Sequence, residues 1–286
     1  MGQSLTLVGC GDSWTWGTEL VDPATCPNPL NYTFDLQHLP VNVEYREQHR
    51  YLKLFADSIG AEQIVDLSQG GCSNDTIVRT LLYWLGDNGY LKDRDTSDLF
   101  VSIGWTNPER KDFYNNKRIT VRDGKDCGWF TLYPNFNHDF GYPELSKFHE
   151  IYVNNLWNEE EYMSRWVGQI YQIETLLTNL KIKYVMHQAF YHHHVGLLSR
   201  NFKSAKNYTD RISSSNRSIW DSINSVKFMH KDDPTTGTFF GYISNYVGQE
   251  NIDSIFPHRN VHHPNALGHK IWAEHMYQYC KENNLL

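Results

Sequence analysis

Short apolar runs that alternate with longer helical segments constrain the fold of this chain most strongly. The runs have the composition of β-strands and lie at residues 5–8, 63–67, 99–103 and 183–187, with a weaker pattern at 225–229. The first three are rich in Val, Ile and Leu, which is typical of short strands buried on both faces of a parallel sheet.

Helical patterns separate these runs, at residues 49–59, 74–85, 159–180 and 264–283. Strands that alternate with helices predict βαβ units, a mostly parallel sheet and helices on both of its faces. In such sheets the functional crevice lies beyond the carboxyl ends of the strands. Ser13, Gly71 and Gly104 each follow the end of a predicted strand. We therefore expect their loops to meet at one edge of the sheet.

Two stretches do not follow this alternation. Residues 108–157 contain a predicted hairpin, in which 119–121 pairs with 129–132 around an Asp-Gly turn. Residues 191–259 are polar and aromatic, with a turn predicted at the three serines 213–215. We interpret both stretches as insertions near the active edge of a single domain that spans residues 1–286.

Composition excludes several classes of protein. The chain has 286 residues, a net charge of −7 and no long basic run, which argues against nucleic-acid binding. Its five cysteines lack metal-ligand spacing, so we expect reduced thiols and synthesis in a cytoplasm. The N-terminus has no basic segment before a long apolar stretch, which predicts no signal peptide. No run approaches the roughly 18 apolar residues of a membrane span.

The two ends of the chain carry the residue types of a serine hydrolase. Ser13 ends a glycine-lined turn at 9–13, and His262 and His263 precede the last predicted helix. A serine hydroxyl becomes an effective nucleophile when a neighbouring base takes its proton, and histidine is the usual base. The alternative role for Ser13 is a helix N-cap, and Asp12 is expected to order the turn through hydrogen bonds to the backbone.

Four segments resemble the conserved blocks of the SGNH (GDSL-type) hydrolases, in the same order along the chain. They are Gly-Asp-Ser at 11–13, Gly-Cys-Ser-Asn-Asp at 71–75, Gly-Trp-Thr-Asn at 104–107 and His-Pro-Asn at 263–265. The resemblance implies a flavodoxin-like three-layer α/β/α sandwich. It also implies ester hydrolysis through an acyl-enzyme, with no metal or organic cofactor. Residues 104–108 also resemble SGNH-type proteins encoded by tailed phages.

Carried over residue by residue, the resemblance makes Ser13 the nucleophile and His263 the base, with His262 as the nearest competitor. His269 is expected to face the surface or the core of the last helix.

The resemblance also implies an oxyanion hole formed by the N–H groups of Ser13 and Gly71 and the side-chain amide of Asn107. Such donors stabilise the negative oxygen that develops when serine attacks a carbonyl. Counted from Gly104, the Asn position of the family falls on Thr106. The choice of Asn107 therefore requires a shift of one residue.

The chain departs from the family at the third member of the triad, because Asn260 stands where the family has Asp. An amide does not stabilise an imidazolium as a carboxylate does, and Asp-to-Asn in a serine protease lowers turnover about 10⁴-fold. Three outcomes remain open. Asp253 or Glu250 takes the position, or Ser13 and His263 act as a dyad with a backbone carbonyl orienting the ring, or catalysis is lost.

These patterns lead to two hypotheses of different class. The first is a serine esterase acting on a small polar ester, such as an O-acetylated glycan. The alternative is a catalytically impaired binding or structural subunit, associated with a virion or with a second copy of the chain. A third class, a metal-dependent deacetylase, is not expected, because the adjacent histidines 192–194 cannot all face one ion in regular structure.

Overall fold

The computed structural model describes residues 4–28, 31–114, 128–134, 143–189, 208–256 and 263–286. Its centre is a sheet of four strands, β1 (Thr6–Cys10), β2 (Gln63–Asp66), β3 (Leu99–Trp105) and β6 (Lys183–Gln188). The strands lie in the order β2-β1-β3-β6, and each neighbouring pair is parallel. The predicted α/β fold with a parallel sheet is confirmed, and the order is that of flavodoxin-like sheets.

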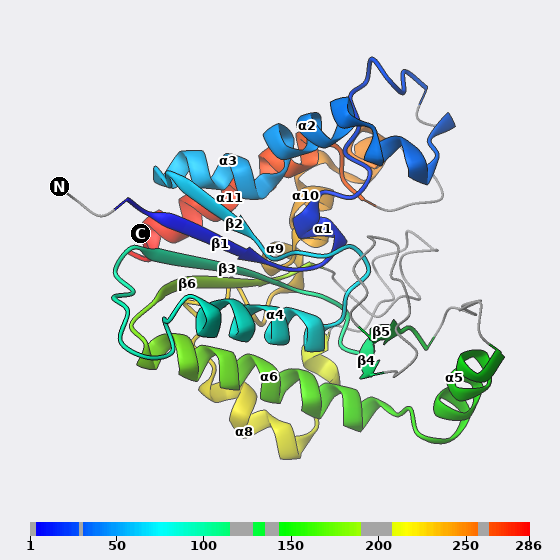
Figure 1. The fold of residues 1–286 in the computed structure, drawn as a ribbon, viewed down its shortest axis with the longest axis vertical. Helices are drawn as coiled ribbons and strands as arrows, with labels where there is room; N and C mark the ends of the chain where they lie inside the picture. Colours follow the sequence, from blue (N-terminus) through cyan, green and yellow to red (C-terminus); the bar gives the residue numbers. More distant parts are fainter. Residues whose placement is uncertain (1–3, 29–30, 115–127, 135–142, 190–207, 257–262) are drawn as a thin grey trace.

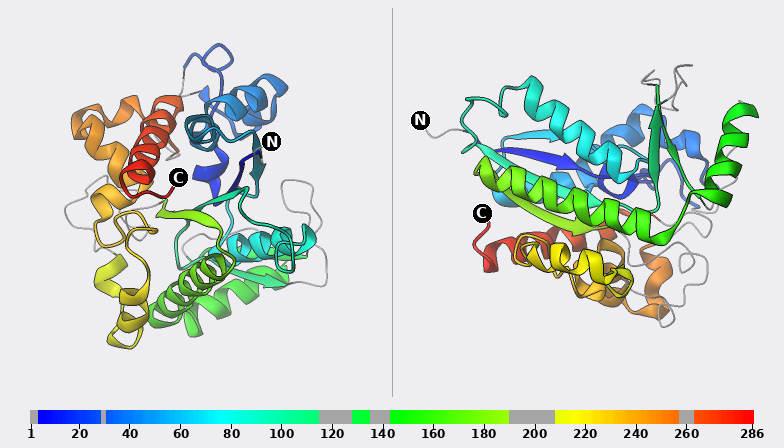
Figure 2. Two further views of the ribbon diagram at one scale, coloured as in Figure 1. Left: turned by 90° about the vertical axis from the view of Figure 1, so that its left-hand side faces the viewer. Right: turned by 90° about the horizontal axis from the view of Figure 1, so that it is seen from below.

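Helices cover both faces of the sheet (Figures 1 and 2). One face carries α3 (Tyr51–Ile59), α10 (Phe239–Val247) and α11 (Ala266–Glu282), with α2 (Pro40–His49) leading into α3. The other face carries α4 (Asn74–Asp87) and α6 (Glu159–Asn179), with α8 (Ser214–Ser222) against α6. The four helices predicted from the sequence are present as α3, α4, α6 and α11. The sequence analysis predicted no helix where α2, α8 and α10 lie.

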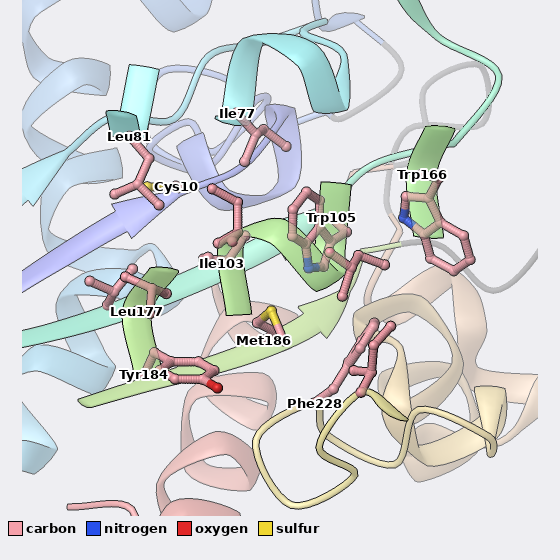
Figure 3. Close-up of a cluster of buried hydrophobic side chains, with 14 of the residues drawn as sticks. Cys10, Ile77, Leu81, Ile103, Trp105, Trp166, Leu177, Tyr184, Met186 and Phe228 are labelled. Atoms are coloured by element: carbon pink, nitrogen blue, oxygen red, sulfur yellow. The ribbon is translucent and has the colours of Figure 1, made fainter. Parts of the chain in front are cut away.

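Alternate side chains of the strands enter two separate cores, as the two-residue period of a strand requires. Ile103 and Trp105 of β3 and Met186 of β6 pack with α4 and α6 (Figure 3). Phe100 of β3 and Val185 of β6 point to the opposite face and pack with α3 and α11. Burial of one such large apolar side chain contributes roughly 1.5–3 kcal/mol. The sheet is therefore held from both sides.

The remaining helical elements of the described chain are α-helices and 3-10 helices of 4 to 13 residues. They are α1 (Ser13–Trp16), η2 (Phe34–His38), α5 (Pro143–Asn155), η4 (Tyr208–Arg211), α9 (Pro234–Gly237) and η5 (Gln249–Ser254). In the parts of the chain that the structure describes, no helix combines the length and apolarity needed to cross a bilayer.

The predicted hairpin exists with a different first strand. β5 (Trp129–Leu132) pairs in antiparallel fashion with β4 (Lys111–Tyr114), whereas 119–121 lies outside the described residues. The rings of Phe113 and Phe130 pack on each other and on Phe148 of α5, which explains this register. In Figure 1 this hairpin and α1 both lie beyond the carboxyl ends of the strands.

Two further predictions were wrong. Residues 225–229 form no strand, and only an isolated bridge joins Phe228 to Met186. The Asn224 side chain accepts the N–H groups of Val226 and Lys227, which folds the segment into a turn instead of a ladder. The serines at 213–215 are not a free turn but the start of α8, with Ser213 as its N-cap residue.

Two fully buried histidines make the stability of this fold sensitive to acid. Burial lowers the pKa of His187 on β6 and of His269 on α11 to about 3. In the unfolded chain the same histidines take up protons near the ordinary pKa of 6.5. Their contribution to the free energy of unfolding is therefore fully present above pH 6.5 and is lost as the pH falls toward 3. We expect the free energy of unfolding to drop by about 1.4 kcal/mol per pH unit for each histidine below pH ~6.

Urea unfolding at pH 7 and pH 5 measures this slope. The variant His187→Gln should show a shallower pH dependence than the wild type. His38→Gln, at an exposed position, is the matched control and should keep the wild-type slope. Equal slopes in all three proteins would contradict the assignment.

Candidate active site

Ser13 lies at the start of α1, directly after the tight turn that ends β1. Asp12 is the N-cap residue of this helix, and its carboxylate accepts the Trp14 N–H at 3.0 Å. The first N–H groups of a helix have no partner within the helix, so the helical ladder does not use the Ser13 N–H. Ser13 is 8% exposed, and the turn holds it at the carboxyl edge of the sheet.

His263 approaches Ser13 from the loop before α11. Its Nε2 lies 2.7 Å from the Ser13 Oγ, across 250 positions of sequence. Asn265 anchors this loop, because its side chain accepts the N–H groups of Leu267 and Gly268 and donates to the carbonyl of Ser254 at 2.7 Å. The expected contact between an early hydroxyl and a late imidazole is thus present in the structure.

The second ring nitrogen of His263 contacts a residue that the sequence did not single out. Nδ1 lies 3.0 Å from Oε1 of Glu19, whose side chain is only 1% exposed. The acidic partner of the ring is therefore neither Asp253 nor Glu250, the two candidates from the C-terminal segment. Asp253 and Glu250 are exposed in η5, and Asn260 lies outside the described residues. Ser13, His263 and Glu19 form a continuous hydrogen-bonded chain.

Glu19 reaches the ring because the backbone turns sharply after α1. Gly17 caps the helix in the left-handed region, and the Leu20 N–H donates to the Gly17 carbonyl at 3.2 Å. Glu19 is the third residue of this turn and has φ +69°, where a non-glycine residue costs roughly 1–2 kcal/mol. The Gln37 side chain of η2 accepts the Glu19 N–H at 3.4 Å. Unfavourable backbone at a site of this kind is a recognised mark of function.

The sequence contained one signal for Glu19. It is an acidic residue six positions after Ser13 and two positions after Gly17, the glycine that ends α1. The SGNH-type resemblance implies an acid at position 260, near the opposite end of the chain, and therefore does not point to Glu19.

Three candidate oxyanion donors lie on loops of adjacent strands. Ser13 follows β1, Gly71 follows β2 with φ +74°, and Asn107 follows β3 and is 4% exposed. The Thr106 hydroxyl donates to Asp12 Oδ2 at 2.6 Å. The Thr106 hydroxyl is therefore already bound to the turn that carries Ser13. This favours Asn107 as the residue of this loop that donates to an oxyanion.

Asp12 and Asn74 tie these loops together. Besides the Trp14 N–H and the Thr106 hydroxyl, the fully buried Asp12 carboxylate faces Arg110 at 3.5 Å. The Asn74 side chain accepts the Thr106 N–H at 2.9 Å and donates to the Thr106 carbonyl at 3.1 Å. The relative positions of the three loops are consequently fixed by hydrogen bonds.

The chain matches a known family over most of its length. Residues 32–226 match the family described as "Family of unknown function (DUF6071)", which is most of the chain. The chain belongs to this family. The region matched to DUF6071 contains Gly71 and Asn107 and lies between the segments that carry Ser13, Glu19 and His263. A search of the curated proteins finds no match.

Solved structures similar to this DUF6071 chain include three hydrolases. The esterase EstA from a Pseudoalteromonas species is 11% identical to this chain. The alignment covers 97% of each chain and has a TM-score of 0.42. A candidate GDSL-like lipase from Parabacteroides merdae is 12% identical, with 100% of this chain and 98% of that chain covered and a TM-score of 0.44. Phospholipase A1 from Streptomyces albidoflavus is 11% identical, with 96% and 99% covered and a TM-score of 0.39.

His269 of α11 faces the core of this DUF6071 chain. His269 is fully buried and accepts the Tyr51 N–H at 3.2 Å, so it joins α11 to α3. His262 and the histidines 192–194 lie outside the described residues. Among the residues that are described, no three His, Cys, Asp or Glu side chains are grouped to hold a metal ion.

The hydrogen-bonded chain predicts that Ser13 reacts with an electrophilic fluorophosphonate, because His263 is placed to take the hydroxyl proton. We expect one adduct per chain, located at Ser13 by peptide mass spectrometry. His263→Ala should slow labelling at least about 100-fold, within the range for loss of a general base. Ser58→Ala, at an exposed serine on α3, is the control and should label like the wild type. Labelling that persists in Ser13→Ala would contradict the assignment.

Proposed function

We propose that this protein is a serine esterase that hydrolyses carboxylic esters through an acyl-enzyme on Ser13. One observation carries the proposal. The buried Glu19 carboxylate contacts His263 Nδ1, and His263 Nε2 contacts Ser13 Oγ at 2.7 Å. A nucleophile, a base and an acid that orients the base define the triad arrangement, whatever their order in the sequence.

The reaction follows from this geometry. The Ser13 oxygen attacks the ester carbonyl carbon while His263 Nε2 accepts its proton. Glu19 stabilises the resulting imidazolium and holds the tautomer that leaves Nε2 free as a base. The N–H groups of Ser13 and Gly71 and the Asn107 amide would stabilise the oxyanion. His263 then protonates the leaving alcohol. In the second half it deprotonates the water that attacks the acyl carbonyl carbon, and it returns that proton to the Ser13 oxygen as the carboxylic acid leaves.

We further propose that the acyl group is small. The Trp14 ring, next to Ser13 in α1, packs against Phe239, Phe240 and Phe256 with centroid distances of 5.0 to 5.9 Å. A long acyl chain on this side would have to displace these rings, and close-packed aromatic groups resist such displacement. Acetate esters, including O-acetylated glycans, fit this restriction.

The presence of Glu19 weakens the main ground for a catalytically impaired subunit. That alternative rested on Asn260 in place of an aspartate, and a buried glutamate now occupies the acidic position beside the ring. A binding or virion-associated role remains the outcome that absence of turnover would favour.

Turnover of p-nitrophenyl acetate tests the esterase proposal. We expect activity in the wild type that Ser13→Ala reduces to the level of buffer. Glu19→Gln should lower kcat by about 10²–10⁴-fold with KM little changed, because the amide no longer stabilises the imidazolium. Glu250→Gln, at an exposed acid in η5, is the matched control and should keep wild-type rates. Equal rates in wild type and Ser13→Ala would end the proposal.

A series of acyl chain lengths tests the restriction on the substrate. We expect kcat/KM to be highest for p-nitrophenyl acetate and to be lower by about 10-fold or more for the octanoate ester. The reason is that the aromatic rings packed around Trp14 leave no room for a long acyl chain. Release of acetate from an acetylated polysaccharide, measured by an enzymatic acetate assay, examines the glycan class directly. A maximum at octanoate would contradict the small acyl site.

A further inference from the structure

Tyr133 contacts the loop that carries the Gly71 N–H. Tyr133 follows β5 directly, and its hydroxyl donates a hydrogen bond to the carbonyl oxygen of Gly71. Gly71 has φ +74°, and a Cβ at this position would lie 2.7 Å from the Tyr133 hydroxyl oxygen. Glycine is the residue with the widest backbone freedom. The tyrosine therefore holds the part of the loop that is intrinsically least constrained.

Arg110 holds the next peptide group of the same loop. Its guanidinium donates to the Cys72 carbonyl at 3.1 Å and to the Thr106 hydroxyl at 2.8 Å. The same group lies over the Tyr133 ring, 4.8 Å from the centroid, which is within the range of cation–π attraction. Two successive carbonyls, of Gly71 and Cys72, are thus fixed from the side of the hairpin.

The hairpin is itself firmly attached to the start of α4. The buried Asp112 carboxylate of β4 accepts the hydroxyls of Ser73 and Thr76, each at 2.6 Å. It also accepts Arg79 at 2.8 Å and the Thr131 hydroxyl of β5 at 2.8 Å. Hydrogen bonds to charged groups are roughly twice as strong as neutral ones. The β4–β5 hairpin that carries Tyr133 is therefore held in a fixed position relative to the Gly71 loop.

We propose that Tyr133 is a positioning residue that orients the Gly71 N–H toward the oxyanion. This inference rests on the proposed esterase function and assigns the β4–β5 hairpin a part in it. The hydroxyl touches no reacting atom and acts through the Gly71 carbonyl. Because an oxyanion donor must be aimed at the position of the transition-state oxygen, a loop released from Tyr133 loses transition-state stabilisation while ester binding is retained.

The variant Tyr133→Phe tests this role, since it keeps the ring beneath Arg110 and removes only the hydroxyl. We expect kcat for p-nitrophenyl acetate to fall about 10-fold, the effect of one lost hydrogen bond near 1.4 kcal/mol, with KM within about twofold. The inhibition constant of a trifluoromethyl ketone should rise by a similar factor, because its hemiketal oxygen occupies the oxyanion hole. Tyr114→Phe, on the same hairpin but 61% exposed, should match the wild type in both measurements.

A second variant covers the case in which Tyr133→Phe does not fold. Arg110→Lys keeps the charge but not the forked geometry, and it should also lower kcat with KM retained. Wild-type kcat and wild-type ketone affinity in the folded variants would overturn the positioning role, as would a lowered melting temperature with unchanged kinetics. Loss of turnover in Ser13→Ala would still support the esterase in either case, so the two proposals fail separately.

Discussion

The buried carboxylate of Asp12 holds together the edge of the sheet that carries the candidate site. A charge removed from water is tolerated only when its oxygens are satisfied, since desolvation costs several kcal/mol. Asp12 meets this requirement with the Trp14 N–H, the Thr106 hydroxyl and the Arg110 guanidinium, which come from α1 and from the loop after β3. Arg110 in turn donates to the loop after β2. The loops of three adjacent strands are thereby joined around one carboxylate.

This constraint explains why the site can be built on short loops. α1 is a single turn of helix, and such a segment has little stability of its own. Its geometry comes from Asp12 below and from the aromatic rings packed on Trp14. With the position of Ser13 fixed in this way, the chain can follow the unfavourable backbone path that places Glu19 behind His263. The backbone strain is confined to Glu19. The contacts of Asp12 and Trp14 that offset its cost come from several elements.

The hairpin β4–β5 shows how an addition to the basic sheet becomes part of the site. Its Asp112 is bound to the first turn of α4, and its Tyr133 and the nearby Arg110 hold successive carbonyls of the Gly71 loop. A parallel sheet alone supplies loops at its carboxyl edge but does not fix their peptide orientations. In this protein, the hydrogen bonds from Tyr133 and Arg110 fix the orientation of these peptide groups.

The sequence by itself determined the four strands of the sheet and the helices α3, α4, α6 and α11, and the resemblance of two distant segments to one family pointed to the pairing of Ser13 with His263. The strands and helices follow from patterns within one segment, because a strand buried on both faces is a short apolar run and a helix repeats its buried face every three to four residues. Only the tertiary structure decided that Glu19 contacts His263, that β4 pairs with β5, and that 225–229 forms a turn with one bridge to β6 instead of a strand. Each of these depends on a left-handed residue, a distant side chain or a competing Asn224 turn, and none of them leaves a periodic trace in the sequence.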